Sequence, residues 1–273
     1  MPSSKPDPLA RSHAPEYIAE FLGTGCMVFF GLSAVVFNFG AGLPMSQWVP
    51  DQSLRRLITG LLFAGTGSLV VISPLGRLSG GHINPSVSLA FFLQGKMRVA
   101  DFLGYVVAQM LGGIAGAAAL SGVWKKYAAS VHDGMTLPGA GWPIWEVFGW
   151  EVAMTGLLVY LIFFFVSSPR LMRWTPFMTW VLIAVMVWLE APISGTSLNP
   201  ARSFGPALVS GNWTAQWLYA VAPPLGGILG LVVFNLTTPW REVLTGKLFH
   251  APNYRSVFKC PPVPAADPEA WIS

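Results

Sequence analysis

Charged side chains are scarce in this chain of 273 residues: Asp, Glu, Lys and Arg together make up 10% of it. Soluble domains carry about 25% charged residues, so this sequence has too little charge to cover a water-exposed surface. Its few basic residues are scattered and its net charge is only +4, which argues against a nucleic-acid partner. The two cysteines, Cys26 and Cys260, lack the spacing of a disulfide framework or a metal knuckle. We therefore expect a membrane protein with no metal and no other cofactor.

Hydrophobic residues make up 53% of the chain and gather in long stretches. A helix needs about 20 apolar residues to cross a bilayer. Six stretches are long enough: 16–39, 55–74, 100–123, 144–167, 175–191 and 213–236. Two others, 84–94 and 199–210, would form helices about 16 to 18 Å long, roughly half the hydrocarbon thickness. We expect these two to be re-entrant half-helices buried in protein.

The two short segments follow similar motifs. Ser-Gly-Gly-His-Ile-Asn-Pro-Ser at 79–86 is echoed by Ser-Gly-Thr-Ser-Leu-Asn-Pro-Ala at 194–201. A Glu-x-x-x-Thr motif at Glu20 recurs in the same order at Glu151. Each repeat holds an odd number of spans, so the second copy must enter the membrane upside down. The pattern predicts an all-α membrane protein of six transmembrane helices and two re-entrant half-helices in an inverted repeat.

Charge and proline content divide the chain further. The predicted parts are an N-terminal segment 1–15, a membrane domain 16–240 with repeats of about 16–124 and 140–240, and a Pro-rich tail 241–273. With both termini inside, eleven Lys and Arg fall on the inner side and five on the outer side. The positive-inside rule then predicts that both termini are cytoplasmic. The proline content predicts that the tail is mobile from about residue 248.

Each Asn-Pro pair predicts the start of a helix. Asn is a favoured N-cap and Pro fits the first helical position, so Asn84-Pro85 and Asn199-Pro200 open the two half-helices. Each helix N-terminus carries roughly half a positive charge, and two such ends facing each other at the midplane repel cations. The Asn amides can also donate to a passing oxygen, so that the bound water cannot accept a proton from its neighbour. This arrangement suits the permeation of neutral molecules without a proton leak.

Four further polar residues are candidates for function. Arg202 lies three positions after Asn199, and a charge at membrane depth marks a functional site unless it snorkels to the surface. Glu20 and Glu151 are either proton relays or acceptors for N–H groups of the irregular loops, and their matched positions favour the scaffold role. His82 either responds to pH or braces its loop, and bracing is the simpler role.

These motifs resemble the aquaporin or major intrinsic protein family over about residues 16–236. The two boxes are Asn84-Pro85-Ser86 and Asn199-Pro200-Ala201. The family usually has Ala where this chain has Ser86, and the small side chain should pack similarly. The resemblance implies a multi-pass homotetramer of the plasma or bacterial inner membrane, with one pore per subunit.

The resemblance also implies a narrow filter on the outer side. Counted from the two Asn residues, its four positions are Ala64, Val187, Thr196 and Arg202. Water-selective members usually carry Phe and His at the first two positions, where this chain has small apolar residues. We therefore expect a wide and weakly polar filter. Phe63 and Trp188 are adjacent in the sequence, and a shift of one residue would bring either of them in.

The sequence thus predicts a passive channel rather than an enzyme, for water and small neutral solutes such as glycerol, urea, hydrogen peroxide and metalloid acids. A secondary transporter with inverted repeats is an alternative, but it needs coupling-ion ligands at the midplane. The acids within the spans include Glu20, Glu146, Glu151 and Glu190, and none of these adjoins an Asn-Pro tip. A second alternative is a protein of the same fold that has a closed pore and a structural role. No catalytic triad or phosphate loop is visible.

Overall fold

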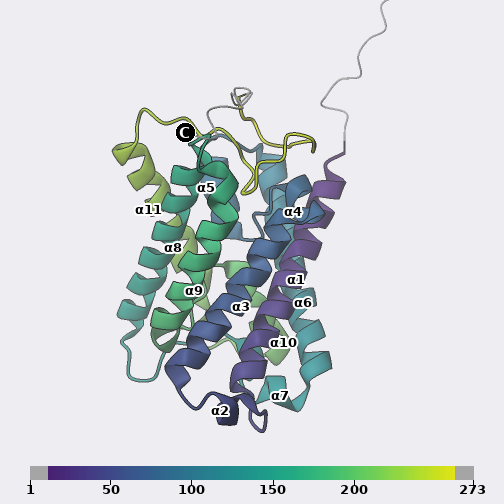
Figure 1. The fold of residues 1–273 in the computed structure, drawn as a ribbon, viewed down its shortest axis with the longest axis vertical. Helices are drawn as coiled ribbons and strands as arrows, with labels where there is room; N and C mark the ends of the chain where they lie inside the picture. The colour runs from purple at the N-terminus through teal and green to yellow at the C-terminus, as the bar shows by residue number, and fades with distance from the viewer. Residues whose placement is uncertain (1–11, 262–273) are drawn as a thin grey trace, which may run out of the picture.

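The computed structural model describes residues 12–261, and these form a bundle of helices with no strand (Figure 1). Six helices are long and apolar enough to cross a membrane: α1 (Ala14–Phe39), α3 (Gln52–Ile72), α6 (Val99–Trp124), α8 (Ile144–Val166), α9 (Thr175–Ser194) and α11 (Gln216–Thr237). Two shorter helices, α5 (Pro85–Leu93) and α10 (Pro200–Ser210), occupy the predicted half-spans. The remaining α-helices are α2 (Met45–Trp48), α4 (Pro74–Ser79) and α7 (Lys126–Ala129). The fold class expected from the sequence is confirmed.

The ends of the helices lie within three residues of the sequence-based ranges, and the end of the second span has a clear local cause. The second span ends at Ile72 rather than at residue 74, because the chain turns at Ser73 and restarts as α4 with Pro74 at its first position. Proline has no N–H to continue the helical ladder, so it favours a new helix start.

Glycines let the helices of each repeat approach closely. In the first repeat, a Cβ on Gly112 of α6 would lie 2.3 Å from the carbonyl oxygen of Phe21 in α1. In the second, a Cβ on Gly230 of α11 would lie 2.2 Å from the carbonyl oxygen of Gly156 in α8. Such distances leave room only for glycine, as is common where membrane helices pack backbone to backbone. The matched pairs α1–α6 and α8–α11 are the framework of the two repeats.

Each half-helix packs against the last helix of the other repeat: α5 contacts α11, and α10 contacts α6. Gly113 of α6 faces Ala201, and Gly227 of α11 faces the backbone of Ser86. In Figure 1, α5 lies near the end of the bundle where α1 begins, and α10 lies toward the opposite end. The half-helices therefore enter from opposite ends, as an inverted repeat requires.

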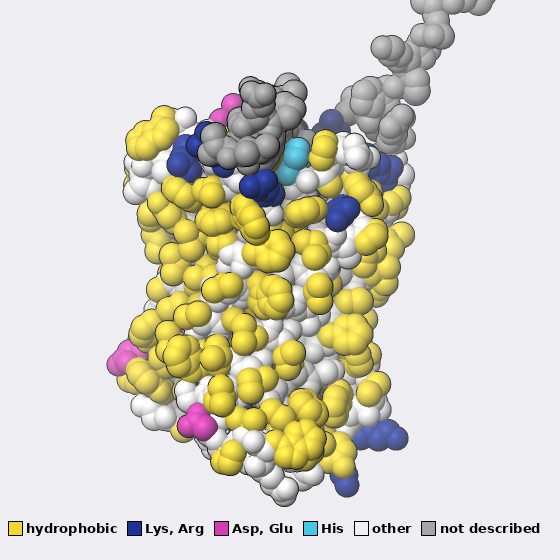
Figure 2. All heavy atoms as spheres, in the orientation of Figure 1, with side chains coloured by type: hydrophobic (Ala, Val, Ile, Leu, Met, Phe, Trp, Pro, Cys, Tyr) yellow, Lys and Arg dark blue, Asp and Glu magenta, His cyan; other side chains and the backbone are white. Residues whose placement is uncertain are grey.

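We call the end of the bundle where α1 begins and α11 ends the terminal face. On the side that it draws, Figure 2 shows a broad apolar band across the bundle and a concentration of Lys and Arg at the terminal face. The band consists of exposed side chains on the long helices, including Leu69, Val107 and Leu189. Exposed apolar side chains over this extent are typical of a surface that faces lipid.

The segment after α11 differs from the mobile tail that the proline content predicts. Up to residue 261 it packs on the terminal face, and it buries Leu248, Val257 and Phe258. These apolar side chains stand between the prolines and provide enough buried surface to order the segment. The rest of the expected tail, 262–273, and residues 1–11 of the expected N-terminal segment lie outside the described residues.

Candidate functional site

A cavity of about 340 Å³ lies inside the bundle, lined by α1, α3, α8, α9 and the N-terminal ends of both half-helices. It brings together residues that are far apart in the sequence. The candidates that line it are Ala64, His82, Asn84, Val187, Thr196, Asn199 and Arg202. The other candidates stand behind the wall: Glu20, Pro85, Ser86, Glu151, Pro200 and Ala201.

Asn84 caps α5, as its sequence context predicts. Its Oδ1 accepts a hydrogen bond from the backbone N–H of Ser86 at 2.9 Å. Its Nδ2 donates to the carbonyl oxygen of Leu198, in the other half of the molecule, at 2.9 Å. One side chain thus starts the half-helix and ties it to its counterpart.

Asn199 repeats this arrangement from the opposite side. Its Oδ1 accepts from the backbone N–H of Ala201 at 3.0 Å, and its Nδ2 donates to the carbonyl oxygen of Ile83 at 2.8 Å. An amide nitrogen carries two hydrogens, so one remains on each Asn after this bond. Both Asn side chains line the cavity, and their remaining N–H groups are available to a molecule inside it.

The residues just before the two Asn residues have unusual backbone conformations. Ile83 has a φ of 43° and Leu198 a φ of 55°, in the left-handed region that side chains rarely adopt. Such strain persists only where the surroundings enforce it, and it often accompanies functional sites. Here it accompanies the two carbonyl groups that accept from the opposite Asn. Sequence reasoning missed these residues, although both stand at the same place in the repeat.

The carboxylate of Glu20 holds the first loop. Its Oε1 accepts from the hydroxyl of Ser79 at 2.7 Å and the backbone N–H of His82 at 3.0 Å. Its Oε2 accepts from the backbone N–H of Ile83 and the side-chain amide of Gln109, both at 2.7 Å. Glu20 is fully buried and all four partners are donors, so its geometry is that of a loop anchor.

Glu151 does the same for the second loop. Its Oε1 accepts from the hydroxyl of Ser194 at 2.5 Å and the backbone N–H of Ser197 at 2.7 Å. Its Oε2 accepts from the backbone N–H of Leu198 at 2.9 Å. A buried loop needs partners for its backbone polar groups, and these two carboxylates supply them. Neither lines the cavity, so the arrangement favours the scaffold role over the relay.

Arg202 projects from the first turn of α10 into the cavity wall. Its Nη1 donates to the carbonyl oxygen of Gly134 at 2.7 Å, and its guanidinium carbon lies 5.5 Å from the ring centroid of Phe63. Its Nε has no partner among the described residues. Arg56 also lines the cavity, whereas no Asp or Glu of the described chain does. The wall therefore carries positive charge and N–H donors. Glu151 interacts electrostatically with Arg202 but stands behind the wall, out of the cavity lining.

The four filter positions assigned by spacing lie together on this wall. They are Ala64, Val187, Thr196 and Arg202. The hydroxyl of Thr196 is buried without a partner in the described structure. Phe63 also lines the cavity, whereas Trp188 does not and donates its indole N–H to the hydroxyl of Ser53 at 2.8 Å. An aromatic ring thus joins the wall from α3 beside the small alanine, and α9 contributes the small apolar side chains of Val187, Ala191 and Pro192.

His82 is held on both sides of its ring. Its Nδ1 lies 3.1 Å from the hydroxyl of Ser88, and its Nε2 lies 2.9 Å from the carbonyl oxygen of Gly246. Its ring stacks on that of Phe91 with centroids 4.6 Å apart. This is the geometry of a brace. Sequence reasoning did not reveal Gly246, which lies in the segment after α11.

Comparison with known proteins places this geometry in context. The family model for the major intrinsic protein matches residues 10–234. Aquaporin Z of Rhodopseudomonas palustris is 32% identical over 234 residues, which cover 82% of this chain and 93% of the relative. Aquaporin NIP1-1 of Arabidopsis thaliana is 32% identical over 255 residues, covering 89% and 82%. The X-ray structure of the aquaglyceroporin from Plasmodium falciparum superposes with a TM-score of 0.70 at 21% identity, covering 84% of this chain and 98% of that one, a likeness of fold.

Proposed function

The chain belongs to the major intrinsic protein family, and on that premise we propose that its cavity is a passive transmembrane pathway for water and other small neutral solutes. The observation that carries the proposal is the pair of capping residues, Asn84 and Asn199, that line one cavity with an unused amide N–H each. A water molecule that accepts from both must direct its lone pairs toward them. It can then not accept a proton from the next water.

Electrostatics supports the exclusion of ions by the same pathway. Both half-helices begin at the cavity, and each N-terminus contributes a partial positive charge. Arg202 and Arg56 add full charges to the wall, with no acid of the described chain lining it. A cation would lose its hydration here and meet a positive potential, which is how pores of this kind reject cations. A neutral solute has no ionic hydration to lose and is not repelled by the positive potential.

The filter determines which solutes accompany water. We assign it to Ala64, Val187, Thr196 and Arg202, with Phe63 as an additional apolar surface. The guanidinium of Arg202, which lines the cavity, donates to a solute oxygen, and Thr196 lies on the same wall. The methyl and isopropyl groups opposite leave space. This combination suits glycerol, urea, hydrogen peroxide and undissociated metalloid acids.

We extend the proposal to topology and assembly. The terminal face carries most of the Lys and Arg, which favours a cytoplasmic location for both termini. The pathway domain spans about 16–240, with repeats of about 16–124 and 140–240. Membership of this family favours a homotetramer in the plasma or bacterial inner membrane, with one pathway in each subunit.

Osmotic shock of proteoliposomes tests the function. We expect stopped-flow light scattering to show faster shrinkage than in protein-free liposomes, and faster entry of at least one of the solutes named above. Saturable uptake driven by an ion gradient would instead indicate a secondary transporter. No acceleration for water or any solute would indicate a closed structural member of the fold.

A filter variant tests the solute assignment. Ala64→Phe with Val187→His places two rings in the wall where this chain has a methyl and an isopropyl group. We expect water permeability to persist and glycerol entry to fall by about tenfold, because a steric barrier of about 1.4 kcal/mol has that effect. Ser53→Ala, which lies outside the cavity lining, is the control. Glycerol entry that equals wild type in the double variant would contradict the filter assignment.

A further inference from the structure

The segment after α11 lies against the terminal face instead of leaving it, as Figure 1 shows for its yellow trace. Three backbone hydrogen bonds seat the segment on the bundle. The N–H of Leu248 donates to the carbonyl oxygen of Gly80 at 2.9 Å, and that of Lys259 donates to the carbonyl oxygen of Lys96 at 2.8 Å. The N–H of Leu244 reaches the end of α8 at 3.2 Å. The segment is thus attached along its length, next to both α4 and α5.

Lys247 is the best-anchored side chain of this segment. It is only 3% exposed, and its Nζ donates to the carbonyl oxygens of Arg77 at 2.7 Å, Arg255 at 2.8 Å and Tyr254 at 3.3 Å. An ammonium group has three N–H donors, and here each has an acceptor. Burial lowers the pKa of Lys247 to about 8, while the nearby Glu16 carboxylate acts in the opposite direction. A buried charge must be hydrogen-bonded. One of its acceptors, Arg77, belongs to α4 and the other two belong to the segment itself, so Lys247 both orders the segment and ties it to the bundle.

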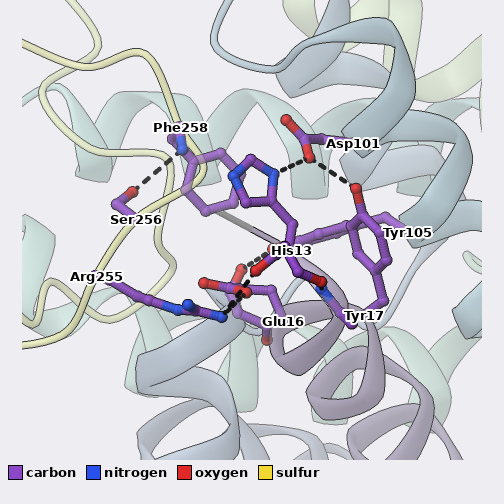
Figure 3. A network of polar contacts seen from close by, with 11 residues as sticks. His13, Glu16, Tyr17, Asp101, Tyr105, Arg255, Ser256 and Phe258 are labelled. Atoms are coloured by element: carbon purple, nitrogen blue, oxygen red, sulfur yellow. Dashed lines mark hydrogen bonds and ion pairs between the residues drawn. The ribbon is translucent and has the colours of Figure 1, made fainter. Parts of the chain in front are cut away.

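A second attachment joins the segment to the start of α1, as Figure 3 shows. Arg255 donates from Nη2 to the Oε2 of the buried Glu16 at 2.6 Å. Beside it, Asp101 of α6 contacts the Nδ1 of His13 at 2.5 Å and accepts from the hydroxyl of Tyr17 at 2.8 Å. The side chain of Arg255 is 38% exposed, but that of Glu16 is only 1% exposed. Releasing Arg255 would leave a buried carboxylate without this partner, so this attachment also holds the segment in place.

The segment also reaches the cavity itself. Leu248 is buried and belongs to the cavity lining, together with Val71 and Ile162. The neighbouring ring of Phe258 lies 5.1 Å from that of His82, whose Nε2 contacts the carbonyl oxygen of Gly246. An apolar side chain thus stands where a polar solute would enter or leave at the terminal face. Hydrophobic constrictions of this kind can close a pore by excluding water.

We propose that residues 241–261 are an autoinhibitory lid, with Leu248 as the plug and Lys247 as the latch that holds it. The inference rests on the proposed pathway through the cavity. When the lid is docked, Leu248 narrows the exit at the terminal face. When it is released, the exit is lined by His82 and the turn at Gly80 and Gly81.

Two pairs of substitutions test the lid by water permeability in proteoliposomes. Lys247→Ala removes the latch and Leu248→Ala shortens the plug. Their matched controls are Lys259→Ala, an exposed lysine of the same segment, and Leu244→Ala, a leucine outside the cavity lining. We expect each test variant to raise water permeability at least about threefold by shifting the lid toward its open state. The controls should equal wild type, and test variants that equal their controls would overturn the lid.

A variant in the opposite direction covers the case in which Lys247→Ala does not fold. Leu248→Trp enlarges the plug without touching the latch, and we expect it to lower water permeability at least about threefold. Size-exclusion chromatography establishes that each variant is assembled. Leu248→Trp with unchanged permeability would contradict the plug.

A labelling experiment separates failure of the lid from failure of the proposed function. Ile162→Cys, in a background with Cys26→Ala and Cys260→Ala, places one thiol in the cavity lining near the lid. A membrane-impermeant maleimide added from the terminal face should label it about tenfold faster when Lys247→Ala is also present. Faster labelling without any solute flux would uphold the lid and refute the pathway. Normal water flux with equal labelling rates would refute the lid alone.

Discussion

The two loops that lead into the half-helices, 79–84 and 194–199, share one design but have different surroundings. Each ends in a capping Asn and is held by a buried glutamate. The first loop is further supported by the side chain of Gln109 and, through His82, by the lid. The second contains Thr196 and precedes Arg202, and both of these residues belong to the filter that we propose. The repeat thus supplies a common scaffold, and the residues attached to each copy give the two ends of the cavity different roles.

Replacing Glu20 and Glu151 should have the largest effect on stability, and it should show which of the two loops depends more on its glutamate. Glu20→Gln and Glu151→Gln each remove the charge and replace one of the two acceptor oxygens by an amide NH2, which faces the donors of the loop. Breaking a buried, hydrogen-bonded charge costs about 3–5 kcal/mol, so we expect poor yields and lower thermal midpoints in detergent. Glu20→Gln should be the worse of the two because Glu20 accepts four bonds and Glu151 accepts three.

The exposed acid Glu146, at the start of α8, supplies the control for this comparison. Glu146→Gln should change the free energy of unfolding by no more than about 0.5 kcal/mol, so its thermal midpoint should stay close to that of wild type. If the thermal midpoint of Glu20→Gln equalled that of wild type, Glu20 would not be the anchor of the first loop.

Glycine substitutions should have an intermediate effect and should sharpen the comparison of the two half-helix contacts. A Cβ on Gly113 would lie 2.3 Å from the carbonyl oxygen of Ala201, whereas one on Gly227 would lie 3.0 Å from that of Ser86. We expect Gly113→Ala to destabilise the fold by about 1–3 kcal/mol through overpacking, and Gly227→Ala by less. Thermal midpoints measured by fluorescence-detected size exclusion give the order.

Gly122 is the matched control on the same helix as Gly113, because a Cβ there meets no atom within 4 Å. Gly122→Ala should stabilise the helix by up to about 1 kcal/mol. If Gly227→Ala destabilised the protein more than Gly113→Ala, the asymmetry between the two contacts would be reversed.

Substitutions at Ser86 and Ala201, the third residues of the two Asn-Pro motifs, should have the smallest effect on stability. The hydroxyl of Ser86 is buried and has no partner in the described structure. Ser86→Ala should therefore be neutral or stabilising by about 1 kcal/mol, with unchanged water permeability. Ala201→Ser adds such a hydroxyl in the second box and should destabilise by a similar amount. A loss of water flux in Ser86→Ala would show that the hydroxyl contacts the permeating molecule.

Most of the fold could be predicted because the bilayer restricts what a sequence can do. Long apolar runs must become helices, so the six spans followed from hydrophobicity alone. The half-helices followed from their insufficient length and from Asn84 and Asn199, whose capping role depends only on local geometry. The filter positions were expected from the resemblance to the family, carried over by their distance in sequence from these caps, and all four line one cavity.

The residues that escaped prediction act through tertiary contacts without a periodic signal. Gly134, which accepts from Arg202, lies in an irregular connection. The strain at Ile83 and Leu198 runs against the preference of both residue types. The ordered segment after α11 was hidden by its prolines, although its buried leucine and phenylalanine were a visible indication.

The central claim is that the cavity between Asn84 and Asn199 passes water but not protons. Stopped-flow light scattering of proteoliposomes that also contain a pH-sensitive dye measures both fluxes in one preparation. The account predicts osmotic water permeability well above that of protein-free liposomes, with proton flux equal to theirs. Water permeability equal to that of bare lipid, or proton flux that rises together with water flux, would contradict it.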